Sequence, residues 1–208
     1  ILPSKEFIDI FKATPGALSV TEAISIMNIA AEAPKGLYIE LGVYRGKSAI
    51  SAAISLKPEN IFILVEPEFD NMAWQEEVYY SVLGINKQLN IKCIAGYSTD
   101  EIPKHDWYAY VFVDSGVHDD LVIEEIKMLE DKIVKDGIIA FHDYGNQFTA
   151  VARAYDYLIS TGKYESIPID WNTIINYVKE HDLENGNNSW HIYPEHPFPN
   201  FVGALKRK

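Results

Sequence analysis

The chain has 208 residues, with 30 acidic and 18 basic side chains and a formal net charge of −12. Such an acidic surface repels the phosphate backbone, so we expect no nucleic-acid substrate. A single cysteine precludes an internal disulfide and favours a reducing, cytoplasmic setting. We expect no membrane segment, because no stretch approaches 18 apolar residues and the first residues lack a secretory-signal pattern.

A chain of this length supports one substantial hydrophobic core. We therefore expect a single domain over residues 1–208. It would consist of a helical N-terminal extension (1–35), a cofactor-binding core (36–165) and a C-terminal strand pair with a candidate lid (166–208). In the extension, Ser19 and Glu22 have the spacing of a capping box and predict a helix from there to about Ala33. This helix would pack across the sheet edge or cover the cofactor pocket.

Short apolar runs alternate with helical patterns between residues 37 and 143, which is typical of βαβ units around a parallel sheet. The pattern predicts an α/β, Rossmann-like three-layer fold. The expected strands are 37–41, 61–65, 91–95, 109–113 and 137–141. The expected helices are 46–56, 69–89, 119–135 and 147–162.

The pattern weakens after residue 160. A final strand pair is expected at 164–169 and 201–205, with a helix near 172–180 and a candidate lid over 182–200. Aromatic residues there either line an acceptor pocket or form a small core under a loop: Trp190, Tyr193, Phe198 and Phe201. In the second core helix another aromatic group consists either of packing residues or of a homodimer face: Trp74, Tyr79 and Tyr80.

A glycine-containing loop runs from Glu40 to Ser48, at the end of the first core strand and the start of a helix. Gly42 and Gly46 would allow a tight turn and a close approach of backbone to a ligand. Their spacing differs from the G-x-G-x-x-G dinucleotide fingerprint, which argues against NAD. Glu66 ends the next strand, where a carboxylate can accept both hydroxyls of a ribose. Together the two features predict an adenosine site, whereas an ordinary turn and a solvated loop charge are the alternatives.

Acidic side chains follow the fourth and fifth strands, whose carboxyl ends open on the same side of a parallel sheet. Asp114, Asp143 and His142 could there hold a hard divalent cation such as Mg²⁺. Alternatively no metal binds, Asp114 orders a cofactor ammonium group and Asp143 caps the following helix. His118 and His142 are candidate general bases, because a histidine pKa lies near neutrality. Capping or surface roles are the alternative for both.

Several of these segments together resemble the class I S-adenosylmethionine-dependent methyltransferases of the small O-methyltransferase type, called methyltransferase domain 24. The segments are 39–50, Glu66, 96–98, 113–114 and 141–144. The resemblance implies a mostly parallel seven-stranded sheet of order 3-2-1-4-5-7-6, with an antiparallel seventh strand at 201–206. It also implies a histidine three residues after the aspartate of the fourth strand, whereas His118 follows Asp114 by four.

By the same resemblance, five residues of the loop would hold the methionyl part of S-adenosylmethionine: Glu40, Gly42, Tyr44, Gly46 and Ser48. Glu66 would bind the ribose, and Tyr97 and Ser98 would edge the adenine. The group of Asp114, His118, His142 and Asp143 favours methylation of an oxygen on a small, sugar-like or phenolic acceptor. The alternatives are another Rossmann-type enzyme, either hydroxylase-like or an oxidoreductase, and a non-catalytic cofactor-binding subunit.

Overall fold

The computed structural model describes residues 2–115, 120–145, 149–183 and 202–208. Its strands are β1 (Leu37–Leu41), β2 (Ile61–Glu66), β3 (Asn90–Ala95), β4 (Tyr108–Val113), β5 (Ile133–Phe141), β6 (Tyr164–Ser166) and β7 (Gly203–Arg207). Its α-helices are α1 (Lys5–Ala13), α2 (Val20–Glu32), α3 (Lys47–Ala53), α4 (Met72–Ile85), α5 (Ser98–Glu101), α6 (Leu121–Leu129), α7 (Thr149–Ser160) and α8 (Trp171–Glu180). Short 3₁₀ turns follow β2 (Pro67–Asp70) and α5 (Ile102–Lys104).

The seven strands form one sheet of order β3-β2-β1-β4-β5-β7-β6. The first five strands in this order pair in parallel, whereas β7 runs antiparallel to both β5 and β6. The predicted strand order and the antiparallel seventh strand are therefore confirmed. The apolar runs explain the arrangement, because a central parallel strand is buried on both faces, as β4 is along its whole length.

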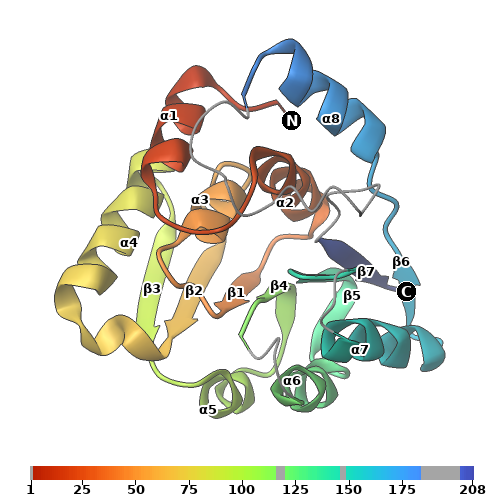
Figure 1. Cartoon of the computed structure of the whole chain (residues 1–208). Coiled ribbons are helices and arrows are strands. Elements are labelled where there is room, and N and C mark those ends of the chain that lie inside the picture. The colour runs from red at the N-terminus through yellow and green to blue at the C-terminus, as the bar shows by residue number, and fades with distance from the viewer. Residues whose placement is uncertain (1, 116–119, 146–148, 184–201) are drawn as a thin grey trace.

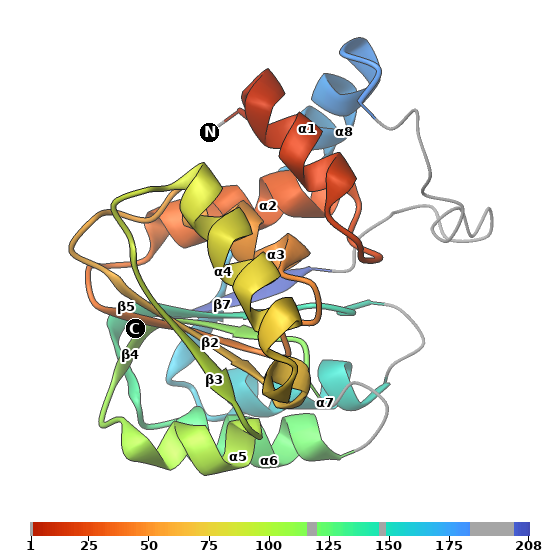
Figure 2. The ribbon, with the colours of Figure 1, turned by 90° about the vertical axis from the view of Figure 1, so that its left-hand side faces the viewer.

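Helices cover both faces of the sheet (Figures 1 and 2). The layer of α2, α3 and α4 lies on one face, and α5, α6 and α7 lie on the other. Outside the first layer, α8 packs on α2 and α1 contacts α3. Alternate strand residues point to opposite faces. Tyr110 and Phe112 of β4 therefore join the core beneath α2 and α3, and Val111 and Val113 join the core above α6 and α7.

The predicted capping box starts α2 as expected. The Glu22 amide donates to Ser19 Oγ at 3.2 Å, and the Ser19 amide donates to Glu22 Oε2 at 2.7 Å. Helix α1, by contrast, was not predicted within the N-terminal extension. It begins at the Ser4 cap, and its buried residues Phe7, Ile8 and Phe11 form a single apolar stripe. A helix of nine residues has too few turns for its apolar periodicity to be distinguished from that of an irregular segment.

The boundary between α6 and β5 corrects the sequence prediction. The helix predicted over 119–135 ends at Leu129, and residues 133–135 belong to β5, which is longer than the predicted strand 137–141. The reason is tertiary pairing: Tyr108 of β4 donates its amide to Lys132 O at 2.7 Å and faces Ile133. The register then shifts between Tyr108 and Tyr110, and β4 and β5 pair again from Tyr110 and Ile138 onward. Single-sequence periodicity contains no information about that partner strand.

Other predicted elements are found with shifted ends. The helix predicted over 69–89 is α4, which Asn71 caps after the 3₁₀ turn, and the strand predicted over 164–169 ends at Ser166. Most of the candidate lid and its aromatic residues lie outside the described residues, which resume at residue 202. Within the described ranges, no helix combines the length and the apolar character needed to cross a bilayer.

Leu64 of β2 tests the central core, because its side chain is fully buried whereas Leu2 is 61% exposed. We expect Leu64→Ala to lower the free energy of unfolding by about 2–5 kcal/mol, through lost transfer energy and a residual cavity. Leu2→Ala, the matched control, should change it by less than about 0.5 kcal/mol. Urea unfolding followed by circular dichroism measures both variants, and equal losses would contradict the assigned core.

Candidate active site

Four strands end at the same edge of the sheet, and backbone hydrogen bonds continue past their last residues. The Gly42 amide donates to Val65 O at 3.0 Å, and the Asp114 amide donates to Leu41 O at 2.9 Å. The His142 amide donates in turn to Val113 O at 3.1 Å. The first residues after β1, β4 and β5 are therefore held side by side, and Glu66 ends β2 at the same edge.

The loop between β1 and α3 requires glycine at both predicted positions. Gly42 and Gly46 have φ angles of +83° and +82°, in the left-handed region that disfavours side chains. A Cβ on Gly42 would lie 2.6 Å from the carbonyl oxygen of Asp114, and one on Gly46 would lie 2.8 Å from Val78 Cγ1. The loop is thus a tight turn packed directly against the end of β4 and against α4.

Glu66 faces this loop. Its Oε2 accepts hydrogen bonds from the amides of Val43 at 3.0 Å and Tyr44 at 2.8 Å, and its Oε1 accepts one from Glu68 at 3.2 Å. The structure thus brings the glycine turn and the carboxylate together, as the sequence predicts. A carboxylate offers about four acceptor sites, so Glu66 retains capacity for another donor. Its ribose-binding role stays a prediction.

Trp74 of α4 supports the outer side of the loop. Its indole Nε1 donates to Tyr44 O at 2.7 Å, and the guanidinium of Arg45 lies 4.1 Å from its ring centroid. Tyr44 itself contacts the indole edge-on and is 57% exposed. Trp74 is therefore a packing residue within this chain, and the homodimer face stays a prediction. Tyr79 and Tyr80 pack edge-on against each other, and Tyr80 is exposed.

Glu40 of β1 is fully buried beneath the turn. Ser48 Oγ donates to its Oε1 at 2.6 Å, whereas Oε2 has no hydrogen-bond partner within the described part of the chain. Burial raises the pKa of Glu40 to about 8, against the lowering effect of the Ser48 hydrogen bond. The nearby charges of Asp114 and Glu66 raise this pKa further. Glu40 therefore holds a proton at neutral pH and presents one unsatisfied oxygen.

Tyr97 and Ser98 lie where β3 ends and α5 begins. The Gly96 amide donates to the backbone oxygen of Glu66 at 3.4 Å, which places this turn beside the end of β2. Ser98 is buried and Tyr97 is 64% exposed. Both residues therefore border the same edge as Glu66, and their adenine-binding role stays a prediction.

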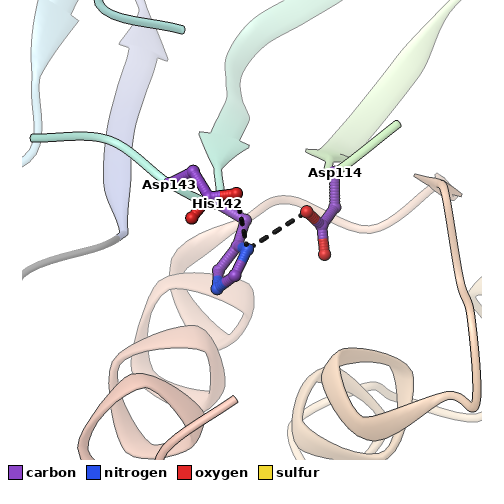
Figure 3. A group of neighbouring side chains, drawn as sticks. All are labelled: Asp114, His142 and Asp143. Carbon is purple, nitrogen blue, oxygen red and sulfur yellow. Dashed lines mark hydrogen bonds and ion pairs between the residues drawn. The ribbon is translucent and has the colours of Figure 1, made fainter. Parts of the chain in front are cut away.

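Asp114, His142 and Asp143 form one cluster at the ends of β4 and β5 (Figure 3). His142 Nδ1 lies 3.1 Å from Asp114 Oδ1 and 3.5 Å from Asp143 Oδ2. Asp143 has a left-handed backbone, with φ +58°, and its carboxylate lies beside the His142 ring. One ligand atom from each residue lies within 4.8 Å of the others, a separation that a single metal ion can span. The structure thus assembles the group that the sequence predicts.

A further carboxylate, missed in the sequence, approaches the same ring from helix α2. Glu22 Oε1 lies 3.3 Å from His142 Nε2, and the Glu22 side chain is buried. The capping-box pattern was recognisable from the sequence, and it accounts for Glu22 Oε2. The position of Oε1 depends on how α2 packs over β5, which no local spacing encodes.

His142 lies between three carboxylates and carries a positive charge in this arrangement. Burial alone would lower its pKa, but Asp114, Asp143 and Glu22 together raise the pKa of His142 well above its ordinary value. An imidazolium donates from both nitrogens and has no lone pair. His142 must therefore release one proton before it can act as a base or bind a cation. The other predicted base, His118, lies outside the described residues.

Comparison with known proteins identifies the family. The family model for methyltransferase domain 24, described as a methyltransferase domain, matches residues 39–144. The chain belongs to this methyltransferase family. The predicted resemblance to class I S-adenosylmethionine-dependent methyltransferases is thereby confirmed. The match begins in β1 and ends just after Asp143, so it includes the glycine turn, Glu66 and the Asp114 cluster.

Solved structures of methyltransferases share the fold. The O-methyltransferase TomG of Streptomyces achromogenes, in complex with SAM, superimposes with a TM-score of 0.60 at 16% identity, over 81% of this chain and 84% of TomG. A Bacillus cereus O-methyltransferase in complex with SAH gives 0.62 at 10% identity, over 100% of this chain and 93% of that one. Precorrin-6y C5,15-methyltransferase of Geobacter metallireducens gives 0.55 at 13%, over 71% and 74%. A search of curated proteins finds no match.

Glu40 provides a test of the buried site through its pKa. Folding raises that pKa from 4.5 to about 8, so the folded state keeps a proton that the unfolded chain releases. Glu40 therefore makes the free energy of unfolding fall as pH rises through this window. Glu40→Gln removes this dependence, so its stability relative to wild type should increase from about pH 4.5 to pH 8 and then level off. Urea unfolding at several pH values measures the difference, and a constant difference would contradict the raised pKa.

Proposed function

We propose that the chain transfers the methyl group of S-adenosylmethionine to a hydroxyl oxygen of a small molecule, assisted by a divalent cation. The observation that carries this proposal is the placement of the Asp114, His142 and Asp143 cluster beside the glycine turn and the buried Glu40. Family membership supports methyl transfer. The O-methyltransferase structures in complex with SAM and SAH support this cofactor and an oxygen acceptor.

The residues at the edge fit S-adenosylmethionine. Glu40 Oε2 is buried without a partner among the described residues. Once Glu40 releases its proton, this oxygen becomes an acceptor, and the ammonium of the methionyl part would offer the donors that it lacks. Gly42, whose missing side chain lets the end of β4 approach the turn, would hold the methionyl part together with Tyr44, Gly46 and Ser48. Asp114 lies next to Gly42 and would also face the ammonium. When bound, S-adenosylmethionine supplies a methyl group on a positively charged sulfur.

The adenosine part would extend toward β2 and β3. Glu66 would accept the ribose hydroxyls with the acceptor sites that Val43, Tyr44 and Glu68 leave open. Tyr97, exposed at the end of β3, and Ser98 would border the adenine. Methyl transfer depends mainly on alignment of the reacting groups, and a site held by ladder hydrogen bonds provides that alignment.

The cluster of Asp114, His142 and Asp143 fits a hard divalent cation such as Mg²⁺. Carboxylate oxygens are the ligands that such a cation prefers, and Nδ1 of His142 would add a third ligand atom after losing its proton. The cation would lower the pKa of an acceptor hydroxyl, as metal ions do for bound water. Its charge would also offset the carboxylates that surround His142. The acidic edge favours neutral, sugar-like or phenolic acceptors over polyanions.

Glu66 tests the cofactor site. We expect Glu66→Ala to weaken binding of the demethylated product, S-adenosylhomocysteine, by more than tenfold, about 1.4 kcal/mol, because a ribose acceptor is lost. Glu68→Ala, which removes an exposed carboxylate two residues further on, is the matched control and should bind normally. Titration calorimetry measures both variants. Unchanged affinity in Glu66→Ala would contradict a role of Glu66 in the site. A wild-type chain that binds NAD but neither S-adenosylmethionine nor S-adenosylhomocysteine would contradict the proposed cofactor.

Asp143 tests the role of the cation. A panel of phenolic and sugar hydroxyl compounds is assayed for methyl uptake, with Mg²⁺ and with a chelator. We expect turnover to fall by at least tenfold in chelator, and Asp143→Asn to lose the stimulation by Mg²⁺ because one charged ligand is removed. Exposed Asp156→Asn serves as the control. Full turnover in chelator would contradict cation assistance while leaving methyl transfer itself intact.

A further inference from the structure

We propose that Glu22 is a positioning residue: its carboxylate accepts a hydrogen bond from Nε2–H of His142, which keeps the proton on Nε2 and leaves Nδ1 free for the cation. This inference rests on the proposed function, because Nδ1 is the nitrogen that faces Asp114 and Asp143. It assigns a role in the site to the N-terminal helix α2, which lies before the segment 39–144 that matches the family model.

Carboxylates approach the ring of His142 from two opposite sides. Glu22 Oε1 lies 3.3 Å from Nε2, whereas Asp114 Oδ1 lies 3.1 Å from Nδ1. Figure 3 shows the ring extending from the end of β5, with Nδ1 toward the two aspartates. Histidines that bind metals commonly donate their other ring N–H to a carboxylate, which fixes the tautomer and the ring orientation. Glu22 occupies that position relative to His142.

The two carboxylate oxygens of Glu22 contact different groups. Oε2 accepts hydrogen bonds from the Ser19 amide and from Ser19 Oγ, both at 2.7 Å, and these bonds close the capping box. Oε1 takes no part in the cap. Among the described residues it is buried and forms no hydrogen bond, and the His142 ring, at 3.3 Å, is the group within ion-pair distance of it. The cap therefore explains one oxygen and leaves the other for His142.

Contacts fix the segment before α2 relative to the site, as a positioning role for Glu22 requires. Lys47 opens α3 directly after Gly46, and its buried ammonium donates to Gly16 O at 3.2 Å and lies 4.4 Å from the Phe11 ring centroid. Gly16 and Phe11 belong to the segment that leads into α2. The N-terminal segment is thus joined to the glycine turn through Lys47 and to the strand ends through Glu22.

Substitution of Glu22 by glutamine separates its role in the capping box from its contact with His142. Glutamine also completes a capping box, so Glu22→Gln keeps the cap if its single carbonyl oxygen stays with the Ser19 amide. The amide NH₂ then faces His142 Nε2 as a donor. That donor favours the opposite tautomer, in which Nδ1 carries the proton and has no lone pair for a cation. Ser19→Ala is the complementary control, because it weakens the cap and leaves Glu22 Oε1 unchanged.

The full chain and both variants are compared by calorimetry with Mn²⁺ alone and by ¹⁵N NMR of the histidine rings, with His142→Asn to assign the signals. We expect Glu22→Gln to bind Mn²⁺ about 10–100-fold more weakly. Its His142 ring signals should shift, and its melting temperature should stay near that of wild type. Ser19→Ala should melt at a lower temperature with wild-type Mn²⁺ affinity and ring signals.

The results that contradict the role of Glu22 differ from the result that contradicts the cation site. Wild-type Mn²⁺ affinity and unchanged His142 signals in Glu22→Gln would overturn the inference and leave the proposed function standing. Equal effects of Glu22→Gln and Ser19→Ala on Mn²⁺ binding would assign Glu22 to the cap alone and also overturn it. A wild-type chain that binds no Mn²⁺ would contradict the proposed cation site itself, and the ring signals would then still decide whether Glu22 fixes the tautomer.

Discussion

The contact between Gly42 and the backbone of Asp114 is the constraint on which the site depends. A Cβ at residue 42 would stand 2.6 Å from the Asp114 carbonyl oxygen, so only glycine lets the ends of β1 and β4 meet. From that contact, ladder hydrogen bonds continue to His142 on one side and to the end of β2 on the other. Backbone packing thus places the carboxylates of neighbouring strands around one turn.

The same packing concentrates negative charge, which burial makes costly unless it is compensated. Two pKa shifts compensate part of this charge: burial raises the pKa of Glu40 to about 8, and Asp114, Asp143 and Glu22 raise the pKa of His142 well above its ordinary value. A cationic cofactor and a divalent metal ion are ligands that can take over this compensation. The electrostatics of the site and the proposed chemistry therefore point to the same kinds of ligand.

The sequence allowed much of the fold and part of the site to be predicted, and the difference has a physical origin. Local patterns located the core strands, the capping box of α2 and the turn at Gly42, and the family resemblance supplied the strand order. The end of α6 was misplaced because pairing with Tyr108 overrides local periodicity. Glu22 was missed as part of the site because its contact with His142 spans 120 positions of the chain and depends on how α2 packs.

The most direct measurement of the central claim is a crystal structure of the chain with S-adenosylhomocysteine. The expected ligand lies along the turn from Gly42 to Gly46, with its amino group at Glu40 Oε2 and its ribose hydroxyls at hydrogen-bond distance from Glu66. A ligand bound elsewhere, with Glu40 Oε2 still unsatisfied and Glu66 bonded only to backbone amides, would contradict the claim that this edge is the cofactor site.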